Sequence, residues 1–264
     1  MLSIAGSKKI KAKKRRNKIK NCAAEIFSAA FFWWLDTIFL LCYTKIESNT
    51  EPSGTPTVYN YTYGNNYWKD QLTAYNGNQI TYDANGNPLT NYDGFTFTWN
   101  GRQLVSASNN SAYTVTFTYN EAGLRQTKTV DGITTTYNYN GSLLLSEQNS
   151  ERIILYMYDG NGSLIGFMCC MTADVDEGNH NFDVYYYEKN LQGDVIAVRD
   201  ENGAVRYSYL YNAWGELVYA YAHNGAENTT ARYNTIFYRG YYFDEDLCLY
   251  YLNTRYYDDS HKET

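Results

Sequence analysis

Histidine is the residue type best suited to acid–base catalysis at neutral pH, and this sequence has three. His180, His223 and His261 all stand in polar segments. None lies beside a serine or cysteine motif such as G-x-S-x-G, which would supply the nucleophile that a catalytic histidine activates. The pattern therefore predicts solvated loop histidines without a catalytic role.

Two acidic groups, Asp174-Val-Asp-Glu177 and Asp244-Glu-Asp246, are the next candidates for chemistry. Neither follows the oxygen-ligand spacing of an EF-hand with its closing glutamate. A glycosidase pair is defined by a separation in space that sequence does not give. We therefore predict solvated turn residues here, and neither a metal site nor a cofactor site.

The cysteines give no framework for a metal or for disulfides. They are Cys22, Cys42, Cys169, Cys170 and Cys248. None forms a CxxC pair, and two of them are adjacent, which suits neither a zinc knuckle nor a simple disulfide pattern. Free or buried thiols are expected. With no catalytic residue identified, the sequence predicts a protein that is not an enzyme.

Aromatic rings are abundant, with 30 tyrosines in 264 residues. Exposed rings such as Tyr209 and Trp214 could stack on sugars, which would make the protein a surface adhesin that binds carbohydrate. The rings recur in every repeat, however, and a binding site needs only a few special positions. Packing within a wall is therefore the favoured role of the rings, and the adhesin is kept as an alternative.

The elements that carry these rings form a repeat. Its anchor aromatics are spaced 17, 20, 20 and 19 residues apart. They are Tyr82, Trp99, Tyr119, Tyr139 and Tyr158. Each is followed by Asn or Asp and a glycine-containing turn, and ten of the 19 glycines directly follow Asn or Asp. Such dipeptides form tight hairpin turns. The repeat therefore predicts an all-β fold of consecutive hairpins in one antiparallel sheet.

A tyrosine at every second position marks one further hairpin. Tyr207, Tyr209 and Tyr211 fall on one face of an extended chain, and Tyr219 and Tyr221 continue the alternation after a break. We predict that Asn212 to Gly215 turns the chain and that the rings stack across the strands.

Charge divides the chain into two unlike parts. Nine of the 22 Lys and Arg residues lie between Lys8 and Lys20, and removing these nine from the net charge of −6 leaves −15 for the remainder. An acidic body repels a phosphate backbone, so no nucleic acid partner is expected. The apolar segment 22–43 is a possible N-terminal helix and membrane anchor, although Asp36 makes its insertion marginal. Alternatively, residues 1–50 are unrelated to the rest.

The repeats, for example Thr116-Phe-Thr-Tyr-Asn-Glu-Ala-Gly-Leu124, resemble the YD repeats of the Rhs family. The later pieces Tyr209-Leu-Tyr-Asn-Ala-Trp-Gly-Glu216 and Arg255-Tyr-Tyr-Asp258 resemble the Rhs repeat-associated core domain. The residues that carry the core resemblance are Leu191, Gly193, Asp194, Tyr211, Trp214, Gly215, Arg239, Gly240, Tyr241, Asp244, Tyr250, Tyr251, Arg255, Tyr256, Tyr257 and Asp258.

The resemblance implies a curved, spiralling antiparallel sheet that forms part of a hollow shell. Complete members are bacterial polymorphic toxins that enclose a C-terminal toxin cargo or are displayed at the cell surface. In the family a proline follows the aspartate, whereas Asp259 follows Asp258 here. The self-cleavage segment and the toxin lie beyond that point, so neither activity is carried over. We expect a non-enzymatic, secreted or surface shell fragment, with the adhesin and a self-cleaving processing domain as alternatives.

The expected organisation has six parts. They are 1–50, the basic run and apolar segment; 51–57, a linker; 58–171, YD repeats; 172–183, a polar loop; 184–258, an incomplete core domain; and 259–264, a tail.

Overall fold

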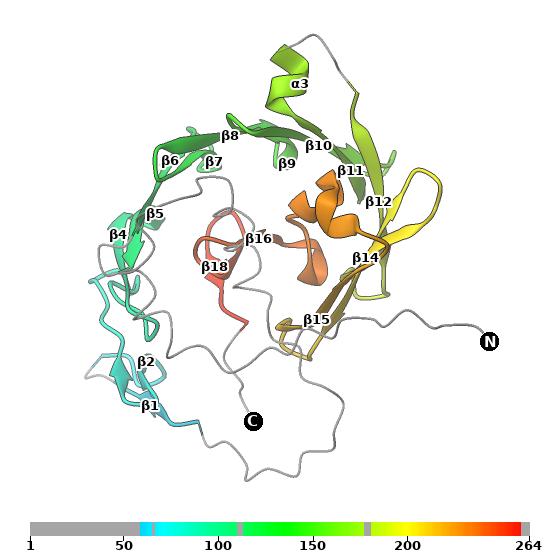
Figure 1. Cartoon of the computed structure of the whole chain (residues 1–264). Coiled ribbons are helices and arrows are strands. Elements are labelled where there is room, and N and C mark those ends of the chain that lie inside the picture. The colour runs from blue at the N-terminus through cyan, green and yellow to red at the C-terminus, as the bar shows by residue number, and fades with distance from the viewer. Residues whose placement is uncertain (1–58, 65–66, 110–112, 177–180, 260–264) are drawn as a thin grey trace, which may run out of the picture.

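The computed structural model describes residues 59–64, 67–109, 113–176 and 181–259, which form a largely antiparallel β structure (Figure 1). Its main element is a sheet of twelve strands, β4 to β15, in which every strand pairs with its neighbours in sequence. The predictions of an all-β fold and of consecutive hairpins are confirmed. The N-terminal helix predicted over 22–43 lies outside the described residues.

The strands of the large sheet are β4 (Phe95–Asn100), β5 (Gln103–Asn109), β6 (Tyr113–Tyr119), β7 (Arg125–Val130), β8 (Ile133–Asn140), β9 (Leu143–Gln148), β10 (Arg152–Tyr158), β11 (Leu164–Met171), β12 (Asp183–Lys189), β13 (Val195–Asp200), β14 (Val205–Tyr211) and β15 (Leu217–Ala222). Two three-stranded sheets flank it in sequence: β1 (Tyr61–Tyr63), β2 (Leu72–Tyr75) and β3 (Asn78–Gln79), and β16 (Tyr242–Asp244), β17 (Leu249–Tyr251) and β18 (Tyr256–Tyr257).

Short helices complete the chain. They are α3 (Thr172–Asp176) and the 3₁₀ helices η1 (Ala226–Asn228), η2 (Thr230–Tyr233) and η3 (Tyr238–Gly240). Helix α3 begins the segment for which the sequence predicts a polar loop. No helix within the described part of the chain is both long and apolar enough to cross a membrane.

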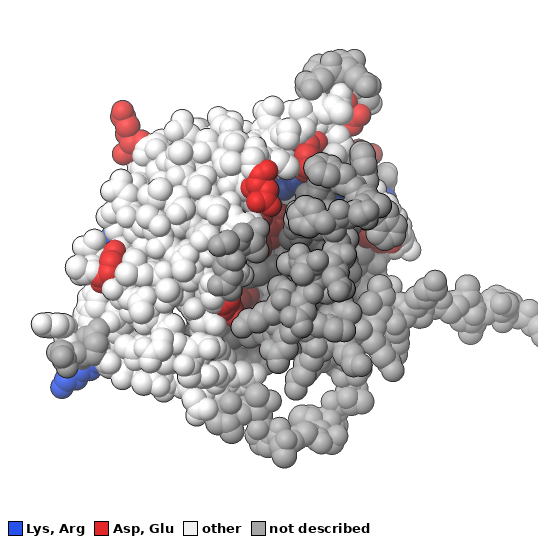
Figure 2. Space-filling model, turned by 60° about the vertical axis from the view of Figure 1, so that its left-hand side comes forward, with Lys and Arg blue, Asp and Glu red and all other residues white. Residues whose placement is uncertain are grey.

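The large sheet bends into an arc whose inner face is apolar (Figure 1). On β4, Phe95 and Phe97 are buried while Thr96 and Thr98 point outward and are exposed. The outward threonines pair across strands, as where Thr118 and Thr127 share a hydroxyl hydrogen bond of 2.7 Å. Few charged side chains lie on the face of the molecule seen in Figure 2. Period-two alternation of apolar and hydroxyl residues therefore gives the sheet its inside and its outside.

The curvature has a repeated local cause. Seven pairs of neighbouring strands in the large sheet contain a register shift, and five of these shifts directly precede an aromatic residue of the repeat: Trp99, Tyr119, Tyr139, Tyr158 and Tyr211. The other two precede Lys189 and Arg199. A bulge bends its strand and increases the local twist, so one bulge per hairpin curves the whole sheet in one direction.

An asparagine or aspartate holds each of the longer turns. Asn120 Oδ1 accepts the backbone N–H groups of Ala122 and Leu124, both at 3.0 Å, while the Gly123 N–H donates to the Asn120 carbonyl at 2.9 Å. The same three contacts recur at Asp83, Asn91, Asp159, Asn190, Asp200 and Asn212. A short polar side chain at this position therefore closes the turn.

The anchor aromatic of one repeat is tied to the repeat before it. Tyr119 Oη donates to the Leu104 carbonyl at 2.9 Å, and Tyr158 Oη donates to the Leu144 carbonyl at 2.8 Å. Tyr211 Oη makes the same bond to the preceding hairpin. Each acceptor is the carbonyl of an apolar residue at the first or second position of a strand. These bonds explain why the sequence repeats both an aromatic and an apolar residue at fixed spacing.

The structure corrects the predicted stacking of tyrosines across strands. Tyr207 and Tyr209 stack along their own strand, with ring centroids 6.1 Å apart, and alanines lie opposite both rings. Tyr219 and Tyr221 lie on the opposite, outer face, because they pair with Leu210 and Ser208. The register shift next to Tyr211 separates the two rows, so period-two alternation alone did not locate them. The predicted turn at Asn212–Gly215 is present.

Removing one inter-repeat hydroxyl tests this explanation of the repeat. Tyr119→Phe leaves the ring in place but deletes the bond to the Leu104 carbonyl, so we expect the free energy of unfolding to fall by about 1 kcal/mol. Urea denaturation of the 264-residue chain measures the change. Tyr186→Phe is the matched control, since Tyr186 is 44% exposed. Equal stability of both variants and the parent would contradict the proposed role of the hydroxyl.

Candidate functional site

The concave face of the large sheet is covered by the C-terminal part of the same chain (Figure 1). Helices η1 to η3 and strands β16 to β18 lie inside the arc, and we refer to this part of the chain, residues 226–257, as the inner segment. The ring of Phe237 packs edge-on against Tyr209 of β14 at 5.0 Å between centroids. On the other side of the arc, Leu247 is buried among the rings of Phe95 and Phe117. The inner segment therefore contacts both early and late strands of the sheet.

A buried ion cluster joins this inner segment to β7. Arg125 Nη1 lies 2.7 Å from Asp244 Oδ2, and their side chains are only 1% and 0% exposed. Lys128 Nζ lies 3.0 Å from Asp244 Oδ1 and 2.6 Å from Asp246 Oδ2. A buried charge without its partner costs several kcal/mol. Removal of the inner segment from the sheet would therefore leave two cations in an apolar face.

Aromatic rings enclose the Arg125 guanidinium. Its Cζ lies 4.0 Å from the ring centroid of Tyr251 and 4.6 Å from that of Phe117. Its Nη2 donates to Tyr256 Oη at 2.8 Å. A planar cation between ring faces gains attraction while it is desolvated, a geometry that lysine does not reproduce. The sheet and the β17–β18 hairpin thus supply opposite sides of one cation site.

Opposing effects set the pKa values in this cluster. Burial raises the pKa of Asp244, but the charges of Lys128 and Arg125 outweigh it and hold that pKa below its ordinary value. Burial lowers the pKa of Lys128, but Asp244 and Asp246 raise it well above its ordinary value. Burial also raises the pKa of Glu245. The central pair is therefore ionised at neutral pH.

The prediction that Asp244-Glu-Asp246 forms a solvated turn is wrong for Asp244, which is fully buried. Its partners Arg125 and Lys128 lie more than 100 residues earlier, and the sequence analysis missed both. Strict alternation would place positions 125 and 128 on opposite faces, but the register shift next to Tyr119 puts both inside. Two cations in an otherwise polar strand gave no sign of burial.

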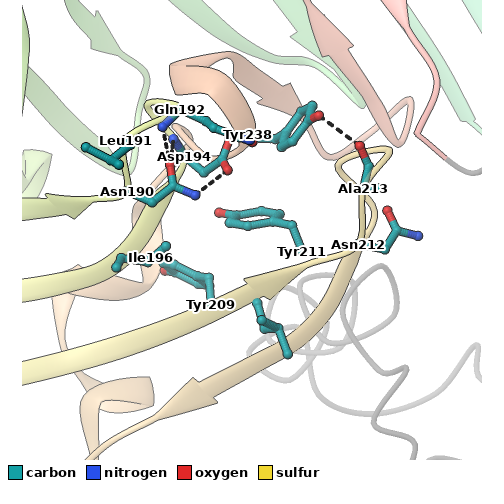
Figure 3. Close-up of a pocket in the computed structure, with 11 residues that line it drawn as sticks. Asn190, Leu191, Gln192, Asp194, Ile196, Tyr209, Tyr211, Asn212, Ala213 and Tyr238 are labelled. Atoms are coloured by element: carbon teal, nitrogen blue, oxygen red, sulfur yellow. Dashed lines mark hydrogen bonds between the residues drawn. The ribbon is translucent and has the colours of Figure 1, made fainter.

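Several of the residues that carry the core-domain resemblance, here called the motif residues, meet at one rim of the sheet. They surround an open pocket of about 480 Å³ (Figure 3). Figure 3 shows the Asn190–Asp194 turn on one side and the turn at Ala213 on the other, with Tyr211 between them. Asp194 is 4% exposed and accepts Asn190 Nδ2 at 2.6 Å and the Arg239 N–H at 2.8 Å. The carboxylate thus joins the rim to η3.

The glycines of this group allow close approach. A Cβ on Gly215 would lie 2.3 Å from the ring of Tyr238, and the Gly215 carbonyl accepts Tyr250 Oη at 3.1 Å. The backbone of Arg239 adopts the left-handed region, with φ of 54°, and lies about 4 Å from a Cβ built on Gly193. Hydrogen bonds to carbonyls of the 212–215 turn thereby fasten the inner segment to the rim.

The structure therefore brings most of the motif residues together in two groups. Asp244, Tyr251 and Tyr256 meet Arg125 on β7. The rim group contains Gly193, Asp194, Tyr211, Trp214, Gly215, Arg239, Gly240, Tyr241, Tyr250 and Tyr257. Leu191 lines the rim pocket but is exposed, Arg255 is exposed, and Asp258 accepts a hydrogen bond from Tyr92.

His223 differs from its prediction as a solvated loop histidine. It directly follows β15, is partly buried, and its Nε2 lies 2.8 Å from Ser208 Oγ. Strand pairing makes this contact, so sequence separation concealed it. Within the described ranges, no group of three or more His, Cys, Asp or Glu side chains is arranged to hold a metal ion. Cys169 and Cys170 are buried, Cys248 is exposed, and none of the three forms a disulfide with another described cysteine.

Comparison with known proteins finds similarity to bacterial proteins named tRNA nucleases. It is 34% identical over 197 residues to the tRNA3(Ser)-specific nuclease WapA of Bacillus spizizenii, and 33% identical over 197 residues to the tRNA nuclease WapA of Bacillus subtilis. Each match covers 72% of this chain but 8% of the relative, so the chain spans about 8% of the length of these relatives. No family model matches the chain.

Solved structures share the fold. A crystal structure of TcdB2-TccC3-TEV matches 76% of this chain and 12% of its own, with a TM-score of 0.55 and 21% identity. The Tc holotoxin pore of Photorhabdus luminescens matches 76% of this chain and 11% of its own, with a TM-score of 0.51 and 19% identity. These Tc toxin components and the WapA proteins agree in outline with the resemblance to the Rhs family.

The comparisons overturn the expectation of a non-enzymatic shell fragment, since the curated relatives are named tRNA nucleases. The exclusion of nucleic acid as a partner conflicts with the same names. That exclusion came from the net charge of the acidic body, and a net charge does not describe the local field at one site. The same names give no support to the alternatives of a carbohydrate-binding adhesin and of a self-cleaving domain.

Replacing the buried carboxylate tests the ion cluster. We expect Asp244→Asn to lower the free energy of unfolding at pH 7 by about 3–5 kcal/mol, because Arg125 and Lys128 lose their buried partner. The Asp244 contribution is complete above about pH 4, the ordinary value, and is lost as the pH falls through the lower folded-state pKa. Stability of the variant should therefore depend less on pH below 4.

Urea denaturation across this pH range measures the effect. Asp131→Asn is the matched control, because Asp131 is exposed in a turn with φ of 48°, a conformation that asparagine adopts readily. Parallel pH profiles for Asp244→Asn and the parent would contradict the assigned role of the ion cluster.

A second pair of variants tests the rim. Gly215→Ala places a Cβ against the ring of Tyr238, so it should cost at least about 2 kcal/mol more than Gly132→Ala. Both glycines have similar positive φ values, 91° and 85°, and a Cβ on Gly132 meets nothing within 4 Å. The difference between their thermal or urea unfolding free energies isolates the steric term. Equal losses would mean that Tyr238 moves aside without cost.

Proposed function

We propose that this chain is part of a secreted or surface-displayed bacterial toxin of the Rhs type that cleaves tRNA. The single observation that carries the proposal is the 34% identity over 197 residues to a tRNA-specific nuclease. In this assignment residues 58–171 are YD repeats and residues 184–258 belong to the Rhs repeat-associated core domain. The motif residues of the core hold the inner segment against the sheet.

The geometry supports a wall that encloses part of its own chain. The arc presents aromatic and aliphatic side chains inward and threonines outward, so chain segments are retained on the concave side. The buried pair of Arg125 and Asp244 fixes one such segment in place.

The direct test is cleavage of tRNA by the purified 264-residue chain. Bulk tRNA is incubated with the protein, with and without Mg²⁺, and the RNA is resolved on a denaturing gel over time. We expect discrete shorter products and a loss of full-length tRNA that depends on protein concentration. A ribosomal RNA of similar length and heat-unfolded protein are the controls. Survival of all tRNA at micromolar protein would overturn the assignment of nuclease activity to this chain.

A further inference from the structure

A second cleft, of about 400 Å³, lies where the first repeats meet the C-terminal hairpin. The turn at residues 85–88 and strand β4 form one side, and the β17–β18 hairpin forms the other. The side chains that matter for recognition are Trp68, Trp99, Arg102, Arg255 and Tyr256. The volume falls in the range of small-molecule sites.

Aromatic rings form the walls of this cleft. Trp68 is 52% exposed, and its ring lies directly over the backbone of Gly86, where a Cβ would approach it to 2.3 Å. Trp99 is held by a hydrogen bond of 2.6 Å from Nε1 to the Pro88 carbonyl. Tyr256 is held from behind by Arg125. Trp99 and Tyr256 are therefore held in place by hydrogen bonds, and Trp68 presents its ring at the rim of the cleft.

The charge at the cleft is opposite to that of the body around it. Arg102 and Arg255 are both exposed, and neither takes part in an ion pair within the described chain. Five other arginines do pair with carboxylates: Arg125, Arg152, Arg199, Arg206 and Arg239. No aspartate or glutamate lines the cleft. Two guanidinium groups are thus available to an anion at a place where the protein supplies none.

We propose that this cleft binds a nucleotide, with the base against the indole of Trp68 and the phosphate held by Arg102 and Arg255. Every nucleobase has a flat face that stacks on an aromatic ring, and planar guanidinium groups match phosphate oxygens. The exposed amide of Asn85 lies beside the stacking position and supplies a donor and an acceptor for a base edge. No other combination of two tryptophans and two unpaired arginines lines a cleft described here.

The nucleotide has two sources, a free mononucleotide or a residue at a single-stranded end of RNA. The second source rests on the proposed function, since a tRNA nuclease meets such ends, whereas the nucleotide chemistry of the cleft does not depend on it. The two sources differ in how many phosphates reach the protein. An RNA chain should bind more tightly, and its affinity should fall more steeply with salt.

Tryptophan fluorescence provides the measurement, because two of the five tryptophans line the cleft. The chain is titrated with adenosine monophosphate and, separately, with a single-stranded ribonucleotide trimer. We expect saturable quenching. Affinity should fall about tenfold or more in Arg102→Gln/Arg255→Gln and about tenfold in Trp68→Ala. Arg199→Gln is the matched control, since it removes the same charge from β13, on the outer face, and should leave affinity unchanged.

The outcomes separate the two proposals. No saturable quenching by either probe at millimolar concentration, or equal affinity in the double arginine variant and the parent, overturns the nucleotide site. Tighter binding of the trimer identifies RNA as the source, and equal binding identifies the free nucleotide. Nucleotide binding without tRNA cleavage leaves the site standing and removes the proposed function. Circular dichroism of each variant verifies that the exposed substitutions leave the β structure intact.

Discussion

The structure depends on one constraint, which is that a curved sheet with an apolar inner face must have that face covered. Bulges next to the turns bend the twelve strands in one direction, with buried rings such as those of Phe97 and Phe117 on the inside. Neighbouring hairpins cover only each other's edges. The inner segment covers the face itself, and the Arg125–Asp244 pair favours this docked position, because here the buried cations Arg125 and Lys128 are both paired with a carboxylate.

The parts of this fold that could be predicted from the sequence are the parts that repeat. Tyr119 and Asn120 form their bonds within one hairpin or with the hairpin before it, so a pattern of about 20 residues contains all the information needed. Contacts between the sheet and the inner segment do not repeat. The partners of Asp244 and the contact between Ser208 and His223 depend on register shifts and on strand pairing, which periodicity does not specify.

The expectation that excluded nucleic acid, which conflicts with the names of the relatives, has the same origin. A net charge of −6 for the whole chain, concentrated as −15 outside the basic run, describes the average field and not a particular site. The net charge does not reveal that Arg102 and Arg255 lie close together. These two residues are far apart in sequence and meet only because the C-terminal hairpin docks beside β4. Locating unpaired cations requires knowledge of which carboxylates lie nearby, and that information is tertiary.

The buried ion cluster around Asp244 is physically connected to the proposed nucleotide cleft through two consecutive residues. Tyr256 accepts a hydrogen bond from the buried guanidinium of Arg125 and also lines the cleft, and its neighbour Arg255 supplies one of the two cations. The cleft therefore exists only while the hairpin is docked on the sheet. A ligand that binds only the docked state stabilises that state by mass action, by about 2.7 kcal/mol at a concentration one hundred times its Kd. Nucleotide binding and retention of the inner segment are thus two measures of one equilibrium, with Arg125 acting on both.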